Sequence, residues 1–202
     1  MPSAFDQSRY QIRFEWGADG LARLAASEVV IVVDVLSFSS RVADEVATGG
    51  SVEASGADAA ALARTADASG ALVLLGSLRN ASATARAVLA EQQRRGARTS
   101  IAVIAAGEST AGRTRFAVED QLGAGAIIDA LGELGLDHTS PEAAASCEAF
   151  RGLRGAVRHL MTASGSGQEL LEAGGRDEAL AAAQLDATDA VPVLRDGVFL
   201  AA

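Results

Sequence analysis

The residues with the clearest chemical potential follow an apolar run near the N-terminus. Residues 29–33 are Val, Val, Ile, Val and Val, and this run ends in Asp34. Ser37, Ser39 and Ser40 come next and open a helical pattern. In open α/β sheets, ligands bind beyond the carboxyl ends of the strands, where a carboxylate suits a cation and hydroxyls beside a helix N-terminus suit a phosphate. Asp34 is therefore predicted either to bind such a ligand or to cap the next helix.

Two further loops carry polar groups directly after apolar runs. The strand predicted at 71–75 leads into Arg79 and Asn80, and the strand predicted at 101–105 leads into Gly107 and Glu108. If the strands are parallel, these loops share one edge of the sheet with Asp34. Arg79 offers a planar fork for phosphate or carboxylate oxygens, with a surface ion pair as the alternative. Asn80 is interpreted as a cation ligand or a helix cap.

A pair of acids, Glu119 and Asp120, begins the helix predicted at 116–134. Acids in a first helical turn favour the helix dipole, which is one explanation for them. The other is a cation site, because carboxylate and amide oxygens are the ligands that Mg²⁺ prefers. We predict Asp34, Glu119 and Asp120 as catalytic residues and metal ligands, with Ser37, Ser39, Ser40, Arg79, Asn80, Gly107 and Glu108 binding the substrate.

Other reactive residues give weaker signals. His138 and His159 stand alone, so no zinc site is indicated. Cys147 is the only cysteine, which excludes an intrachain disulfide, and its alanine-rich surroundings predict a small buried residue. The Ser-Gly-Ser-Gly segment at 164–167 is interpreted as a turn, with an anion-binding loop as the alternative.

The predicted elements define an α/β fold. Fully apolar strands at 29–34, 71–75 and 101–105 alternate with helices predicted at 39–48, 57–69, 82–95, 116–134, 141–162 and 176–185. Such strands imply a sheet covered on both faces. We expect one domain over residues 1–202, with three α/β/α layers and a mixed, largely parallel sheet. Asp196-Gly197 between two apolar runs predicts a C-terminal hairpin that adds antiparallel strands at one end.

Composition limits the partners. The chain has 202 residues and a net charge of −9, which argues against a nucleic-acid partner. All 17 basic residues are Arg, so lysine Schiff-base chemistry is excluded. No segment approaches the length of a membrane span, and no signal peptide is evident. We expect a cytoplasmic protein that does not bind membranes.

The motifs together resemble the 2-phosphosulfolactate phosphatase family. The matching segments are DVLSFSS at 34–40, GSLRNA at 76–81, AAGE at 105–108, FAVEDQLGAGAII at 116–128 and SGSGQEL at 164–170. The resemblance implies a Mg²⁺-dependent hydrolase of a small acidic phosphate monoester. The family's named substrate is 2-phospho-3-sulfolactate, on the way to coenzyme M. It also implies that Asp34, Glu108, Glu119 and Asp120 surround metal and phosphate, that Arg79 and Asn80 bind the substrate's anionic groups, and that a homodimer is possible.

Two segments depart from the family pattern. Ser37 to Ser40 replaces the usual Arg-Ala-Thr-Thr, and residues 51–70 have room for only one short strand and one helix, without the family's Asn-Gly turn. The shortened segment at 51–70 favours an alternative function, a catalytically impaired member that binds a phosphorylated or sulfonated acid without turnover. A structural subunit with alanine-rich pairing helices is a third possibility.

Overall fold

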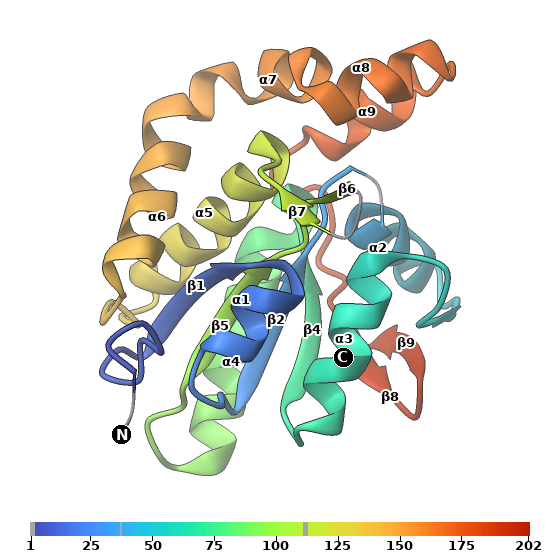
Figure 1. The fold of residues 1–202 in the computed structure, drawn as a ribbon. Coiled ribbons are helices and arrows are strands. Elements are labelled where there is room, and N and C mark those ends of the chain that lie inside the picture. The colour runs from blue at the N-terminus through green and yellow to red at the C-terminus, as the bar shows by residue number, and fades with distance from the viewer. Residues whose placement is uncertain (1–2, 37, 111–112) are drawn as a thin grey trace.

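The computed structural model describes residues 3–36, 38–110 and 113–202, and a seven-stranded mixed sheet runs through it (Figure 1). The strand order is β1-β5-β2-β4-β8-β9-β3. The strands of this sheet are β1 (Ile12–Trp16), β2 (Val29–Val33), β3 (Val52–Glu53), β4 (Leu72–Gly76), β5 (Ile101–Ala105), β8 (Pro192–Arg195) and β9 (Val198–Ala201). β1, β5, β2 and β4 are parallel, whereas β8, β9 and β3 continue the sheet through antiparallel pairs. The predicted mixed, largely parallel sheet is confirmed.

Helices cover both faces of the sheet. They are α1 (Gly17–Arg23), α2 (Phe38–Ala47), α3 (Asp58–Ala68), α4 (Ala81–Arg95), α5 (Val118–Glu133), α6 (Pro141–Leu153), α7 (Val157–Ala163), α8 (Gly165–Glu172) and α9 (Arg176–Ala182). Two short 3-10 turns, Leu78–Asn80 and Arg154–Ala156, precede α4 and α7. None of the helices in the described part of the chain is both long and apolar enough to cross a bilayer.

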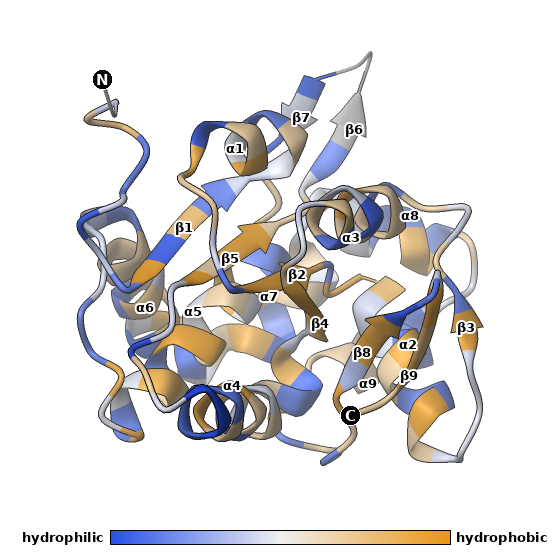
Figure 2. Cartoon of the chain, turned by 90° about the horizontal axis from the view of Figure 1, so that it is seen from below, coloured by the Kyte–Doolittle hydropathy of each residue, from blue (hydrophilic) through white to orange (hydrophobic). Residues whose placement is uncertain are grey.

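Alternation along β2 explains the three layers. Val29, Ile31 and Val33 pack into a core with α4, α5 and α6, whereas Val30 and Val32 pack into a second core with α2 and α3. All five side chains are buried, which is why the strand shows no polar alternation. Figure 2 shows the apolar strands at the centre and the hydrophilic helix faces outside. The predicted α/β/α architecture is confirmed.

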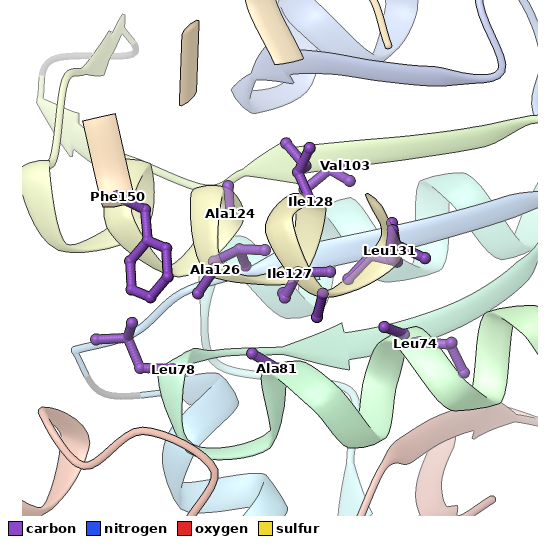
Figure 3. Packing of buried hydrophobic residues seen from close by; sticks show 14 of the residues in the cluster. Leu74, Leu78, Ala81, Val103, Ala124, Ala126, Ile127, Ile128, Leu131 and Phe150 are labelled. Atoms are coloured by element: carbon purple, nitrogen blue, oxygen red, sulfur yellow. The ribbon is translucent and has the colours of Figure 1, made fainter. Parts of the chain in front are cut away.

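α5 packs closely against the sheet at the end of β2. Ile127, Ile128 and Leu131 point from it into the core that also holds Leu74 and Val103 (Figure 3). A Cβ on Gly123 would lie 2.5 Å from Val35 Cγ2, so only glycine permits this approach of α5 to the end of β2. The close packing brings the first turn of α5, with Glu119 and Asp120, to the carboxyl edge of the sheet.

Local differences from the expected elements occur in two loops and one helix. Residues 107–114, expected as a loop, contain most of a small hairpin of β6 (Glu108–Thr110) and β7 (Arg113–Arg115). The loop expected at 164–167 is the start of α8, capped by Ser164, whose hydroxyl accepts from the Gly167 amide. The helix expected at 141–162, with a break at Gly152 or Gly155, is interrupted after Leu153 by the turn at Arg154–Ala156, which contains Gly155. The hairpin around Asp196-Gly197 forms as predicted, and both turn residues have positive φ.

Gly123→Ala is predicted to destabilise the fold by about 1–3 kcal/mol, because its new methyl group would overlap Val35 and push α5 away from β2. Urea unfolding measures the change in the free energy of unfolding. Gly132→Ala is the matched control on the same helix: its Cβ would meet nothing within 4 Å. That variant should gain up to about 1 kcal/mol from helix propensity. Equal stability of the two variants would contradict the role assigned to Gly123.

Candidate active site at the carboxyl edge of the sheet

The parallel register places three predicted loops side by side. Val33 at the end of β2 pairs with Gly76 of β4 and with Ala105 of β5. The residues that follow each strand therefore leave the sheet at the same edge, as expected for the carboxyl ends of parallel strands. The central geometric prediction, that these strand ends are neighbours, is confirmed.

Asp120 connects two of these strand ends. One carboxylate oxygen accepts from the Val35 amide at 2.7 Å, and the other accepts from the Gly107 amide at 2.9 Å. Gly107 has a φ of +65°, and a Cβ there would lie 2.6 Å from the Arg115 carbonyl, so the position requires glycine. Asp120 thus holds the loops after β2 and β5 in a fixed relation to the first turn of α5.

A cavity of about 410 Å³ opens at this edge. Its acidic lining residues are Asp34, Asp58, Glu108, Glu119, Asp120 and Glu169. No basic residue is among its described lining residues. Within the described chain, Glu108 is the only one of these acids that forms an ion pair, and its partner is Arg115. The cavity is therefore a site of concentrated and largely uncompensated negative charge.

The acids influence one another strongly. Burial, together with the charges of Glu119 and Asp58, raises the pKa of Asp34 to about 6, against the lowering effects of the Phe38 amide and of Arg41. Burial and the charges of Asp34 and Glu119 raise the pKa of Asp120 well above its ordinary value. Glu119 is 3% exposed, and its Oε2 is buried without a hydrogen-bond partner among the described residues. A buried carboxylate oxygen without a donor is costly unless a ligand satisfies it.

The structure brings some predicted site residues together and separates others. Asp34, Gly107, Glu108, Glu119 and Asp120 all line the cavity. Ser39 and Ser40 do not, because their hydroxyls bond the backbone of the β2 end: Ser39 Oγ accepts from the Asp34 amide, and Ser40 Oγ donates to the Val35 carbonyl. Ser37 lies outside the described residues.

Arg79 and Asn80 are directed elsewhere. Arg79 donates to Asp44 at 2.6 Å and to the Ala181 carbonyl at 2.7 Å, and it lines a separate cavity between α2 and α9. The Asn80 side chain accepts from the Ser77 amide and donates to the carbonyls of Leu75 and Ala190. The expectation that a guanidinium joins the acids in one pocket is therefore wrong for Arg79. Asn80 does not line the acidic cavity, and its side chain does not cap α4; it completes the capping box of the 3-10 turn Leu78–Asn80, whose N-cap is Ser77.

Sequence reasoning missed Asp58 and Glu169, which also line the cavity. Asp58 begins α3, and a helix that leads into a parallel strand starts at the carboxyl edge of the sheet, so topology gave a usable signal. Glu169 lies on α8, which reaches the cavity only through the arrangement of the C-terminal helices.

Cys147 is buried beside Asp129, as predicted for a small core residue, and burial raises its pKa to about 11.

The fold and site together define an α/β protein with an acidic cavity at the carboxyl edge of its sheet, an arrangement suited to cation-assisted chemistry on an anion. The sequence profile described as 2-phosphosulpholactate phosphatase matches residues 54–197. The chain belongs to this family, in agreement with the resemblance of its motifs. The matched region includes Asp58, Glu108, Glu119, Asp120 and Glu169, and Asp34 precedes it. No curated protein matches the chain.

The cation-free protein is predicted to become more stable as pH falls from about 6 towards 4. The pKa of Asp34 is about 6 in the folded state against an ordinary 3.8, so the folded protein binds this proton more tightly than the unfolded chain. The free energy of unfolding therefore falls as pH rises through this window, by up to about 3 kcal/mol. Urea unfolding in EDTA across this range measures it.

Asp34→Asn should remove the part of this pH dependence that the Asp34 proton contributes and raise stability at pH 7, whereas Asp120, whose pKa burial also raises, keeps its own part. Asp129→Asn is the contrasting control, because Asp129 is a buried acid that Arg151 already neutralises at 2.7 Å. Removing that charge should destabilise the protein instead. Two results would contradict the claim that acids at this edge destabilise the folded state. One is a wild-type free energy of unfolding that stays constant between pH 4 and 6, and the other is an Asp34→Asn variant that is less stable than the wild type.

Proposed function

We propose that this chain is a Mg²⁺-dependent phosphatase that hydrolyses a small acidic phosphate monoester of the 2-phosphosulfolactate class. Family membership supports phosphate-ester hydrolysis. The observation that carries the cation requirement is the buried Glu119 oxygen without a donor, in a cavity that also contains Asp34. The link to coenzyme M biosynthesis, a cytoplasmic location and a homodimer are further expectations of this proposal.

The residues present fit Mg²⁺ with two protein ligands. Mg²⁺ sites commonly use one or two carboxylates and complete their shell with water and substrate phosphate. Among the described residues, no three His, Cys, Asp or Glu side chains form a ready-made ligand cluster, and both Asp120 oxygens already accept from backbone amides. Asp34 and Glu119 would therefore hold the cation, with Asp120 positioning them. When bound, Mg²⁺ supplies positive charge that neutralises the phosphoryl oxygens.

The chain's own groups provide positioning and proton transfer. Asp120 fixes the ends of β2 and β5, which sets the position of Asp34 on the cavity wall. Asp34 has two alternative roles, and in both the ester P–O bond breaks and the substrate leaves as an alcohol that takes up a proton. In the first, an Asp34 carboxylate oxygen attacks phosphorus and water then hydrolyses the aspartyl phosphate to inorganic phosphate. In the second, Asp34 takes a proton from a water that attacks phosphorus directly. Hydroxylamine trapping of an aspartyl phosphate during turnover distinguishes the first role from the second.

Asp34→Asn and Glu119→Gln are each predicted to reduce phosphate release by about a hundredfold or more, because each removes a charge that binds the cation. The assay measures inorganic phosphate from a panel of small phosphorylated acids with Mg²⁺ and with EDTA. Asp129→Asn, folded and away from the cavity, is the activity control. Full activity in EDTA or in Asp34→Asn would contradict the proposal.

The absence of a basic residue among the described lining residues favours a second candidate, a family member that binds an anionic metabolite without hydrolysing it. Its ligand would be a phosphorylated or sulfonated acid accompanied by a cation. Saturable Mg²⁺-dependent binding of phosphosulfolactate, without product by ³¹P NMR, would support this candidate over the phosphatase. Observed turnover would exclude it.

A further inference from the structure

A second polar cavity lies at the opposite edge of the sheet. Its volume is about 220 Å³, and its lining residues include Gln11, Glu28 and Ser100. These three residues directly precede β1, β2 and β5, so the cavity lies at the amino ends of three parallel strands. The acidic cavity lies beyond the carboxyl ends of the same sheet and shares no lining residue with this one.

The charge of this second cavity is opposite to that of the whole chain. Arg9, Arg13 and Arg98 line it, and Glu28 is the only acid among its described lining residues. The Ser100 amide and hydroxyl both donate to the Glu28 carboxylate. Three guanidinium groups against one carboxylate leave a local positive charge in a protein whose net charge is −9.

Arg13 supplies the observation that points to a ligand. It is 5% exposed and forms no ion pair with any described residue. Its Nε donates to the Tyr10 carbonyl, and its Nη1 donates to the carbonyls of Ala25 and Ala26. Nη2 has one contact, to the Ser8 carbonyl at 3.4 Å, although it carries two hydrogens.

Neutral carbonyls orient this guanidinium but do not cancel its charge. Asp6 and Glu28 are close enough to act on this charge, but neither forms an ion pair with Arg13 among the described residues. An anion with several oxygens would contact the guanidinium directly and accept the remaining N–H. Arg9 and Arg98 are exposed and add two further guanidinium groups to the cavity lining. The hydroxyls of Ser8 and Tyr10 provide neutral donors there. This donor set is typical of phosphate recognition by arginine.

We propose that the cavity lined by Arg9, Arg13 and Arg98 is a second binding site, for a small phosphate-type oxyanion, separate from the acidic active-site cavity. The proposal does not rest on the activity proposed above, because it concerns binding at the other edge of the sheet and requires no divalent cation. Bound phosphate would join residues before β1 and β5 and so stabilise the folded state.

The test measures binding of inorganic phosphate and of pyrophosphate by isothermal titration calorimetry, in EDTA and at constant ionic strength. Without a divalent cation, the uncompensated carboxylates of the active-site cavity repel these probes, so saturable binding reports on the basic cavity. The full chain should bind at least one of the two probes, and the melting temperature should rise with its concentration. Tighter binding of pyrophosphate would indicate a diphosphate ligand, and equal or tighter binding of phosphate would indicate a single phosphate group.

Arg9→Ala/Arg98→Ala is predicted to weaken this binding at least tenfold, and both side chains are exposed, so folding should be retained. Arg158→Ala/Arg195→Ala is the matched control, because it removes the same charge from exposed positions that do not line this cavity. Absence of saturable binding of both probes over the millimolar range would overturn the proposal. Equal weakening by the two double variants would also overturn it, since the effect would then be one of net charge.

Discussion

The bridge that Asp120 makes between the Val35 and Gly107 amides is the constraint on which the acidic cavity depends. Two loops that leave the sheet after β2 and β5 have backbone donors that the strands no longer satisfy. A single carboxylate from α5 accepts both donors, and this is possible only because Gly123 allows α5 to lie against the end of β2. The hydrogen bonds of Asp120 therefore depend on the packing at Gly123. Together they determine where Asp34 and Glu119 lie.

The same bridge creates an electrostatic problem. The approach of Asp120 to the strand ends buries its carboxylate and brings it near Glu119 and Asp34. Burial first, and then the charges of the neighbouring acids, raise the pKa values of Asp34 and Asp120. Two amide donors offset part of the cost for Asp120, whereas the Glu119 oxygen has no donor among the described residues. In the proposed phosphatase, a bound cation would offset this imbalance, because one ion compensates several carboxylates at once.

The sequence was sufficient for the features that local chemistry determines. The β-branched runs predicted buried parallel strands, and the change from strand to polar loop predicted the edge at which Asp34, Glu108, Glu119 and Asp120 meet. It was insufficient for Arg79, because its distance from Asp44 on α2 and Ala181 on α9 depends on how those helices pack. Glu169 was missed for a similar reason: an acid within a helix gives no local sign of the cavity it faces.

The two cavities place opposite local charges at the two edges of the sheet, which the net charge of the chain does not reveal. Acids gather beyond the carboxyl ends of β2 and β5, and arginines gather before the amino ends of β1 and β5. The acidic edge can attract an anion only together with a cation, whereas the basic edge can do so unaided. The acidic cavity repels free phosphate, whereas the basic cavity is suited to it. Because the two cavities lie at opposite ends of the same strands, a ligand in one does not displace a ligand in the other.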